Sequence, residues 1–350
     1  AASSPRRRPL PGDPATRYAK AVVSGKTIAG PHVRAACARH IKDLEEGAAR
    51  GLIWDQEAVV HALAFFTEVL CLNGGEYEGK PFELLAWQRF VVGSIFGWKT
   101  VDGHRRFRVA YVETAKGSGK SPLAAGIGMY GMVADNEARA EIYAAATKKD
   151  QAMVLFRDAV AMWQLSPELR SRLKTSGTGE NVWNLAYLEK GAFFRPISAD
   201  DGQSVPRPHI ALVDEVHEHR NNTVVEMMRA GTKSRRQALI FMITNSGSSK
   251  TSTCWGYHDY GAKVADGVLE DDTFFSYICS LDVGEDPIRN EKCWAKANPS
   301  LQEADLPGIK YLREQVREAR GMPAKEALVR RLCFCEWTEA ENPWISADVW

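Results

Sequence analysis

The sequence predicts an α/β fold in which a mainly parallel β-sheet is flanked by helices. Four short apolar runs are typical of buried strands, at residues 107–113, 140–147, 209–215 and 238–245. Segments with apolar residues at helical spacing lie between them, for example at 149–163 and 222–231. A glycine-rich loop also links the first run to a helical pattern at 121–134. Strands that alternate with helices favour a parallel sheet covered on both faces.

The composition is typical of a soluble globular protein. The chain has 350 residues, of which 45% are hydrophobic and 25% are charged, and its formal net charge is +1. This length accommodates one large domain or two modest ones. The near-neutral total removes overall basicity as an argument for a nucleic-acid partner, although a local basic face would be enough.

Cysteines and apolar runs indicate the environment in which we expect the protein. The seven cysteines are scattered and odd in number, which favours reduced thiols over a disulfide framework. Cys333 and Cys335 form the only close pair, and they lack the further ligands that a metal site requires. We recognise no signal peptide and no apolar run of about 18 residues. We therefore expect a soluble, intracellular protein without a membrane partner.

The stretch VETAKGSGKS, residues 112–121, ends as a phosphate-binding loop does, although Thr114 stands where such loops open with glycine. A triphosphate needs inward-pointing backbone N–H groups, a lysine for its β and γ phosphates, and a hydroxyl for Mg²⁺. Lys120 is the candidate phosphate lysine and Ser121 the candidate Mg²⁺ ligand. The residues expected to surround the phosphates are Thr114, Ala115, Gly117, Ser118, Gly119, Lys120 and Ser121.

The run HIALVDEVHEH, residues 209–219, supplies a second half-motif. Asp214 is expected to hold Mg²⁺ through water, and Glu215 to polarise the attacking water as general base. Because both half-motifs follow buried strands in the right order, they predict hydrolysis of ATP or GTP. The alternative is a metal cluster formed by these acids with His217 and His219, but the strand-end interpretation already uses both acids.

Polar residues elsewhere complete the predicted site. Thr244 and Asn245 end the run at 238–245, where they would sense the γ-phosphate and couple hydrolysis to movement. A simple turn is the alternative for this pair. Gln88, on a helical pattern upstream of the loop, is expected to read the adenine edge with its amide, with a surface glutamine as the alternative.

These residues together resemble a known family, the ATPase half of the large terminase subunit of HK97-like tailed bacteriophages, which packages DNA into a capsid. The resemblance spans roughly residues 50–345. It rests on the stretches PFELLAWQRF, AKGSGKS, AAATKKDQA, IALVDEVHEH, ITNSG and DPIRNEKCWAKANPSL. The last stretch has no general ATPase meaning and is the most specific.

The resemblance settles how the loop is interpreted. Terminases of this kind lack the first glycine, so Thr114 is compatible with the loop. Lys116 stands where the family usually has arginine, and is carried over as a catalytic candidate. Lysine keeps the charge but loses the forked geometry that can hold phosphate oxygens.

The resemblance also implies partners. It implies a ring of subunits on the capsid portal, working with a small terminase subunit in the host cytoplasm on double-stranded DNA. A monomer in isolation would have incomplete sites. DNA would be held through its phosphates, and the candidate contacts are Lys148, Lys149, Lys233, Arg235 and Arg236. One subunit's arginine would reach the next subunit's γ-phosphate. Arg195 and Arg207 both precede the Asp-Glu strand, and we favour Arg207.

The expected organisation is an ASCE-type P-loop NTPase with N-terminal helices and a helical lid and linker. We assign residues 1–15 to a mobile basic arm, 16–80 to an N-terminal helical region, 81–260 to the ATPase core and 261–350 to the lid and linker. A β-hairpin is expected within 181–198, and beyond about 255 the strand pattern fades into helical stretches. The nuclease domain of full-length large terminases is expected to be absent, so no DNA cleavage is expected.

Two other functions compete with a packaging motor. Asp214 to His217 spell a DExH box, as in nucleic-acid helicases, for which Gln88 would be the adenine-reading glutamine. Such helicases need a second RecA-like domain, whereas only about 105 residues follow the run at 238–245, and they read as helical. The other alternative is a non-catalytic nucleotide-binding module. Glu215 argues against it, since a pure binder needs no water-activating base.

Overall fold

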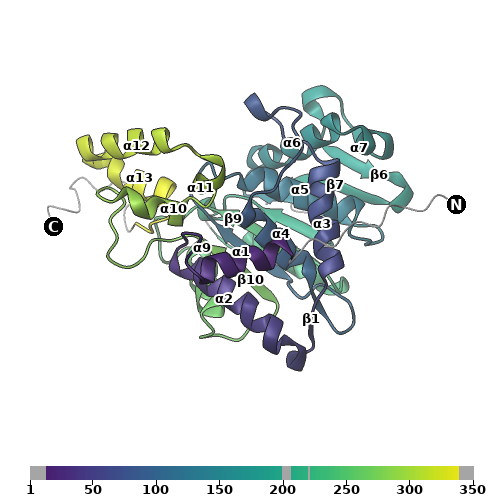
Figure 1. Cartoon of the computed structure of the whole chain (residues 1–350). Helices are drawn as coiled ribbons and strands as arrows, with labels where there is room; N and C mark the ends of the chain where they lie inside the picture. The colour runs from purple at the N-terminus through teal and green to yellow at the C-terminus, as the bar shows by residue number, and fades with distance from the viewer. Residues whose placement is uncertain (1–12, 199–205, 220, 339–350) are drawn as a thin grey trace.

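The computed structural model describes residues 13–198, 206–219 and 221–338. Most of the predicted arm and the last residues of the predicted linker lie outside this part of the chain. The described residues form a central sheet with helices on both faces, and a group of C-terminal helices lies to one side (Figure 1). None of the described helices is long and apolar enough to cross a membrane.

An eight-stranded sheet organises the molecule. Its order is β10-β3-β9-β8-β4-β7-β6-β5. The first six of these strands run parallel, whereas β6 and β5 continue the sheet in antiparallel pairing. In that spatial order the strands are β10 (Phe274–Ile278), β3 (Val109–Glu113), β9 (Leu239–Thr244), β8 (Ile210–Val213), β4 (Glu141–Ala146), β7 (Ala192–Ser198), β6 (Asn184–Tyr187) and β5 (Lys174–Ser176).

The strand order confirms the predicted fold class. β3, which leads into the glycine-rich loop, is separated by β9 from β8, which leads into the Asp-Glu pair. An extra strand between these two is the arrangement of ASCE-type P-loop NTPases. The predicted hairpin is also present, because β6 and β7 pair antiparallel around Gly191, whose φ of 62° is left-handed.

The expectation that the strand pattern fades beyond about 255 is wrong. β10 lies past that point and pairs in parallel with β3, with Phe274 opposite Val109 and Ile278 opposite Glu113. The sheet therefore continues beyond residue 260, the limit expected for the core. A second small sheet was also not predicted, and it pairs β1 (Leu52–Trp54) with β2 (Trp98–Thr100).

Helices cover both faces of the main sheet, and the C-terminal helices lie to one side of it. Their bounds are α1 (Pro14–Val23), α2 (Pro31–Glu46), α3 (Gln56–Val69), α4 (Ala86–Gly97), α5 (Lys120–Val133), α6 (Lys149–Leu165), α7 (Pro167–Arg172), α8 (Thr223–Gly231), α9 (Thr253–Ala265), α10 (Trp294–Ala297), α11 (Leu301–Ala304), α12 (Ile309–Gly321) and α13 (Pro323–Phe334). Several helices begin at a capping side chain. Asp13 accepts the N–H of Thr16 at 2.7 Å and Asp55 that of Ala58 at 2.9 Å, which satisfies donors that a helix start leaves unpaired.

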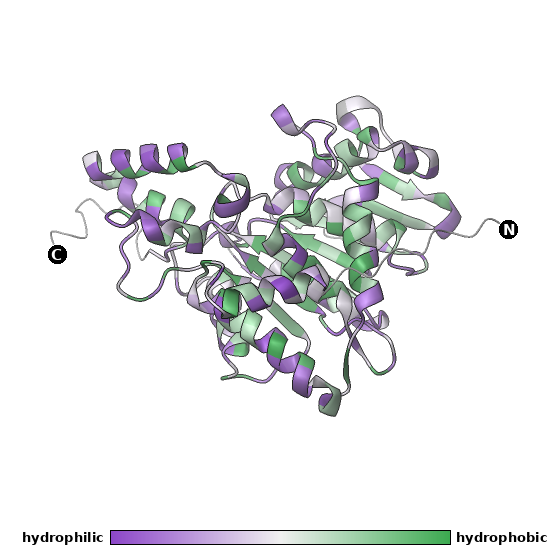
Figure 2. Ribbon diagram, in the orientation of Figure 1, coloured by the Kyte–Doolittle hydropathy of each residue, from purple (hydrophilic) through white to green (hydrophobic). Residues whose placement is uncertain are grey.

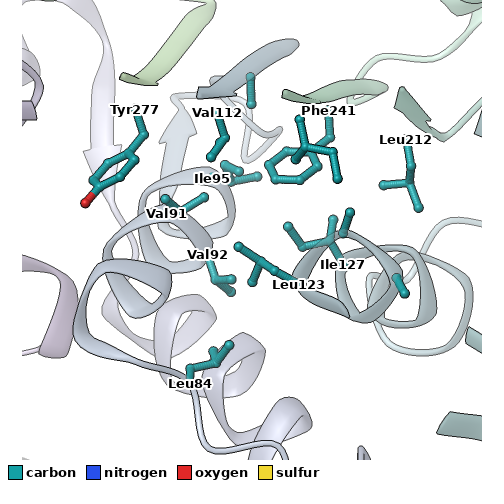
Figure 3. Close-up of a cluster of buried hydrophobic side chains, with 14 of the residues drawn as sticks. Leu84, Val91, Val92, Ile95, Val112, Leu123, Ile127, Leu212, Phe241 and Tyr277 are labelled. Carbon is teal, nitrogen blue, oxygen red and sulfur yellow. The ribbon is translucent and has the colours of Figure 1, made fainter. Parts of the chain in front are cut away.

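Alternation along the strands divides the core into two layers. Val112, Leu212 and Phe241 face α4 and α5, whose Ile95, Leu123 and Ile127 pack beneath them (Figure 3). Tyr111, Val213 and Met242 face the opposite side, where α8 and α9 cover them. The central strands are mostly hydrophobic whereas α12 is largely hydrophilic (Figure 2). The sheet is thus buried on both sides, as a parallel sheet requires.

A glycine in α5 permits close packing of the N-terminal helices against the core. A Cβ atom at Gly126 would lie 2.3 Å from Cε1 of the buried Phe66 in α3. We expect Gly126→Ala to lower the free energy of unfolding by about 1–3 kcal/mol, because the core must shift to admit the methyl group. Denaturant-induced unfolding measures this change.

Gly256 in α9 is the matched control, because a Cβ there would meet nothing within 4 Å. Gly256→Ala should raise the free energy of unfolding by roughly 0.5–1 kcal/mol through helix propensity alone. Equal effects of the two substitutions would contradict the packing described for Gly126.

Candidate nucleotide-binding site

The glycine-rich loop connects the carboxyl end of β3 to the start of α5. Gly117 and Gly119 have φ angles of 85° and 81°, a left-handed conformation that favours glycine. Gly119 caps α5, so the first backbone N–H groups of the helix point out of its end towards the loop. These features make a ready-made anion site, and the structure gives the loop the strand-before, helix-after context that the sequence predicts.

The side chain of Lys120 is buried and folds back onto the loop. Its exposed fraction is 8%. Its Nζ donates to the carbonyl oxygens of Thr114 and Ala115, both at 3.0 Å, and to Oδ1 of Asn245 at 2.7 Å. Burial lowers the pKa of Lys120, and the nearby Glu215 carboxylate opposes that shift. The ammonium therefore lies where the ends of β3 and β9 meet.

The two acids follow β8 at the same edge of the sheet. Asp214 is 6% exposed, and burial together with the charge of Glu215 raises the pKa of its carboxyl to about 7. Its Oδ1 accepts the backbone N–H of Glu215 at 2.8 Å. Burial also raises the pKa of Glu215, which Lys120 partly offsets. Glu215 has a left-handed φ of 48°, an uncommon backbone state that often marks functional sites.

The structure brings Thr244 and Asn245 into this site, between the loop and the acids. Thr244 ends β9 and is fully buried, and its Oγ1 accepts the backbone N–H of His217 at 3.0 Å while donating to the Asn245 carbonyl at 2.8 Å. Asn245 reaches in the other direction and contacts Lys120. The pair thus touches both half-motifs, which supports the coupling position predicted for it without testing the role.

Oxygen ligands for a magnesium ion are available in this arrangement. The hydroxyl of Ser121 and the carboxylate of Asp214 are hard donors of the kind that Mg²⁺ prefers. Burial of Asp214 beside Glu215 concentrates negative charge that a divalent cation would neutralise. Oε2 of Glu215 is buried without a hydrogen-bond partner among the described residues, which leaves it able to accept a bond from water. The residues present therefore fit a nucleotide with Mg²⁺.

The two histidines of the alternative metal cluster contact a backbone carbonyl and a hydroxyl oxygen. His219 lies 3.1 Å from the backbone carbonyl of Asp214 through Nε2, and His217 contacts Thr244 through Nδ1. Within residues 13–198, 206–219 and 221–338, no group of three or more His, Cys, Asp or Glu side chains converges on a common point.

Gln88 and Lys116, both predicted to act at the nucleotide, differ in burial. Gln88 is buried at the start of α4, where its Oε1 accepts the N–H of Leu85 at 2.9 Å and its Nε2 lies 3.5 Å from the carbonyl of Gly119. It therefore faces the loop, and adenine recognition by it stays a prediction. Lys116 is exposed at the turn of the loop, and its backbone N–H donates to the Leu332 carbonyl at 2.8 Å.

The C-terminal helices brace the loop from outside, which sequence reasoning missed. The N–H of Ala115 donates to the Ala297 carbonyl at 3.2 Å, and the Ser300 hydroxyl donates to the Ser118 carbonyl at 3.0 Å. A Cβ atom at Gly117 would lie 2.8 Å from Cβ of Pro307. These partners are about 180 residues or more from the loop in sequence, so no local pattern points to them.

A second unpredicted group lies behind the loop. Glu113, fully buried at the end of β3, accepts from Tyr111 Oη at 2.7 Å, contacts His258 Nδ1 at 2.9 Å and accepts from Trp337 Nε1 at 3.1 Å. Burial alone would lower the pKa of His258, but the Glu113 carboxylate outweighs it and leaves that pKa raised. This cluster fastens the end of the C-terminal segment to the loop strand.

Both arginines considered for a role in a neighbouring site lie away from this one. Arg207 precedes β8, at the amino ends of the parallel strands, and 71% of its side chain is exposed. Its Nε lies 3.7 Å from Glu141. Arg195, on β7, stacks over the rings of Phe193 and Tyr143 at 4.8 and 5.4 Å. Neither reaches Lys120 in the same subunit.

The candidate DNA contacts divide between opposite edges of the sheet. Lys148 and Lys149 follow β4 and are exposed at the edge that carries the loop. Lys233 and Arg236 precede β9 and are exposed at the other edge. Arg235 is occupied, because it donates to Glu137 at 2.9 Å and to the carbonyls of Arg207 and Arg139. The five residues therefore do not form a single surface.

Comparison with known proteins agrees with this geometry. The sequence model of the family described as "Terminase large subunit, ATPase domain" matches residues 86–263, about half of the chain. The chain belongs to the terminase large subunit ATPase-domain family. The matched region contains Gln88, the loop, the Asp-Glu pair and the Thr-Asn pair.

Two curated proteins are similar to the chain in sequence. The large terminase subunit of Enterobacteria phage HK97 is 22% identical over 294 residues, covering 82% of this chain and 55% of that protein. Protein YmfN of Escherichia coli (strain K12) is 30% identical over 147 residues, covering 42% of this chain and 30% of that protein. The chain thus spans about half the length of the HK97 subunit and less of YmfN.

A solved structure shows the same fold. The crystal structure of the HK97 bacteriophage large terminase superimposes with a TM-score of 0.68 at 20% sequence identity, covering 80% of this chain and 55% of that one. The predicted fold class, an ASCE-type P-loop NTPase with flanking helices, is thereby confirmed.

Proposed function

We propose that this terminase-family chain binds ATP with Mg²⁺ and hydrolyses it as the motor domain of a DNA-packaging enzyme. One observation carries the proposal. Lys120, Asn245 and the Asp214–Glu215 pair lie at the carboxyl ends of three adjacent parallel strands, where the loop and the helix start already favour a phosphate. Family membership supports the wider assignment.

The chain's own residues divide the chemistry. Lys120 and the loop N–H groups would neutralise and orient the β and γ phosphates. Mg²⁺, held by Ser121 and through water by Asp214, would add positive charge there. Glu215 would accept a proton from the attacking water, and its raised pKa favours that role because a stronger base accepts a proton more readily.

The helicase alternative is not favoured. The family model that matches residues 86–263 is that of the terminase large subunit ATPase domain. The non-catalytic alternative keeps the same site but gives Glu215 no role, so turnover separates the two.

Glu215→Gln is the direct test. We expect it to abolish at least about 99% of ATP turnover, since a general base contributes roughly 10²–10⁴-fold. ATP affinity should stay within a few fold, because Lys120 and the loop are unchanged. Steady-state phosphate release and equilibrium nucleotide binding measure the two effects. Unchanged turnover would support a site in which Glu215 is not the base.

We further propose that Arg207 completes the site of a neighbouring subunit. Its guanidinium is exposed and lies at the opposite edge of the sheet from the subunit's own loop. It would therefore act in the nucleotide site of another copy and not in its own. Assembly on a capsid portal, with a small terminase subunit and in the host cytoplasm, is proposed from the family resemblance alone. The absence of DNA cleavage stays a prediction.

Turnover per subunit should therefore rise with protein concentration, and Arg207→Ala should remove that rise, lowering the rate on the order of 10³-fold. Arg195→Ala is the matched control and should retain the rise. Mixing Arg207→Ala with Glu215→Gln subunits should restore part of the activity, since some interfaces then contain one intact base and one intact arginine. A rate independent of concentration, with no recovery on mixing, would refute the role in trans.

Double-stranded DNA is the proposed partner, held through its phosphates. The exposed Lys233 and Arg236 precede β9, and the exposed Arg139 precedes β4 at the same edge of the sheet. This group of basic residues supplies the local basic face that the near-neutral total charge allows. Lys148 and Lys149 offer a smaller basic pair at the loop edge.

Replacing both Lys233 and Arg236 by alanine should weaken DNA binding at every sequence and reduce the salt slope of log affinity by about 2. Titration of a random-sequence duplex at several salt concentrations measures this slope. The Lys148→Ala, Lys149→Ala double variant removes the same charge at the other edge and should change the slope less. The reverse result would place DNA at the loop edge.

A further inference from the structure

A continuous chain of contacts joins the phosphate lysine to the general base. Lys120 donates to Asn245, and the backbone carbonyl of Asn245 accepts from Thr244 Oγ1 at 2.8 Å. Thr244 Oγ1 is 3.1 Å from Nδ1 of His217. The same Nδ1 is 3.2 Å from Oε2 of Glu215. His217 therefore stands between the strand end that holds Lys120 and the carboxylate that faces water.

Hydrogen positions follow from the partners. The Thr244 hydroxyl proton is directed to the Asn245 carbonyl, so its oxygen presents lone pairs towards His217. The Glu215 oxygen is also an acceptor. Burial lowers the pKa of His217 to about 4, so the ring is neutral near pH 7 and carries one proton. Facing two acceptors, that proton belongs on Nδ1.

Nδ1 of His217 makes a hydrogen bond to Thr244 but none to Glu215. Nδ1 is aligned as a hydrogen bond to Thr244, whereas Oε2 of Glu215 is at contact distance yet has no hydrogen-bond partner. A small movement of the ring or of Thr244 would transfer the Nδ1–H bond to Glu215. Oε2 of Glu215 has no hydrogen-bond partner among the described residues, and His217 is placed to orient it from this side.

We propose that His217 is a positioning residue. Its Nδ1–H orients the Glu215 carboxylate in one state and bonds to Thr244 Oγ1 in the other. The inference rests on the proposed ATP hydrolysis. A phosphate bound by Lys120 competes with Asn245 Oδ1 for the same ammonium protons. Loss of that contact frees Asn245, and Thr244 beside it then loosens its hold on His217. Occupancy of the phosphate site would thus set the direction in which the base points.

The test uses side chains that place an N–H at different positions. The amide nitrogen of asparagine falls near Nδ1, that of glutamine near Nε2, and alanine has neither. We expect His217→Gln and His217→Ala to lower kcat by roughly 10- to 100-fold, less than loss of the base itself, with KM within about twofold. His217→Asn should recover most of kcat. Equal decreases of kcat in all three variants, or a change in KM alone, would overturn the proposal.

A second measurement does not depend on turnover. Nitrogen NMR of histidine-labelled protein reports which ring nitrogen of His217 carries the proton, with His217→Gln used to assign the signal. We expect the Nδ1–H tautomer in the whole chain, and a change in its shift in Glu215→Gln. An Nε2–H tautomer would overturn the inference even if ATP is hydrolysed, whereas absent turnover with an Nδ1–H tautomer would count against the proposed function alone.

Discussion

The burial of one ammonium group constrains the rest of the site. Lys120 is withdrawn from water, which on its own disfavours its charged form, so the surrounding structure must supply oxygen atoms and negative charge. The oxygens come from Thr114, Ala115 and Asn245, and the charge from Glu215 and Asp214. These groups belong to three neighbouring strand ends. A parallel order that places β3, β9 and β8 side by side is therefore what makes the charged lysine tolerable.

The C-terminal segment is part of the loop's support rather than a separate cover. Carbonyls of Ala297 and Leu332 accept loop N–H groups, and Trp337 donates to Glu113 at the end of the loop strand. Ala115 is fully buried, so its N–H without the Ala297 carbonyl would cost about 1–3 kcal/mol. Movement of the C-terminal helices must therefore exchange these bonds for others, which ties their position to the conformation of the glycine-rich loop.

Sequence reasoning located the strand ends that carry the motifs, because each motif is local in the chain. The loop, the Asp-Glu pair and the Thr-Asn pair each follow an apolar run, and parallel pairing of those runs brings them together. It failed for β10, a run of five residues far from any motif, and for His258 and Trp337, whose partner Glu113 is 145 and 224 positions away. Arg207 shows a different limit. A residue before a parallel strand lies at the opposite edge from one after it, so closeness in sequence to Asp214 does not mean closeness in space.

β9 is the strand that lies between β3, which leads into the glycine-rich loop, and β8, which leads into the Asp-Glu pair. Because β3 and β8 are not neighbours, the hydrogen-bonded ladder between the loop strand and the acid strand passes through β9 alone. Every contact described between Lys120 and His217 uses Thr244 or Asn245 at its carboxyl end. The next residue, Ser246, donates to the carbonyls of Arg331 and Glu336 in the C-terminal segment. Three consecutive residues therefore touch Lys120, the loop that carries Glu215 and the C-terminal helices, so a shift at this strand end cannot leave any of the three unchanged.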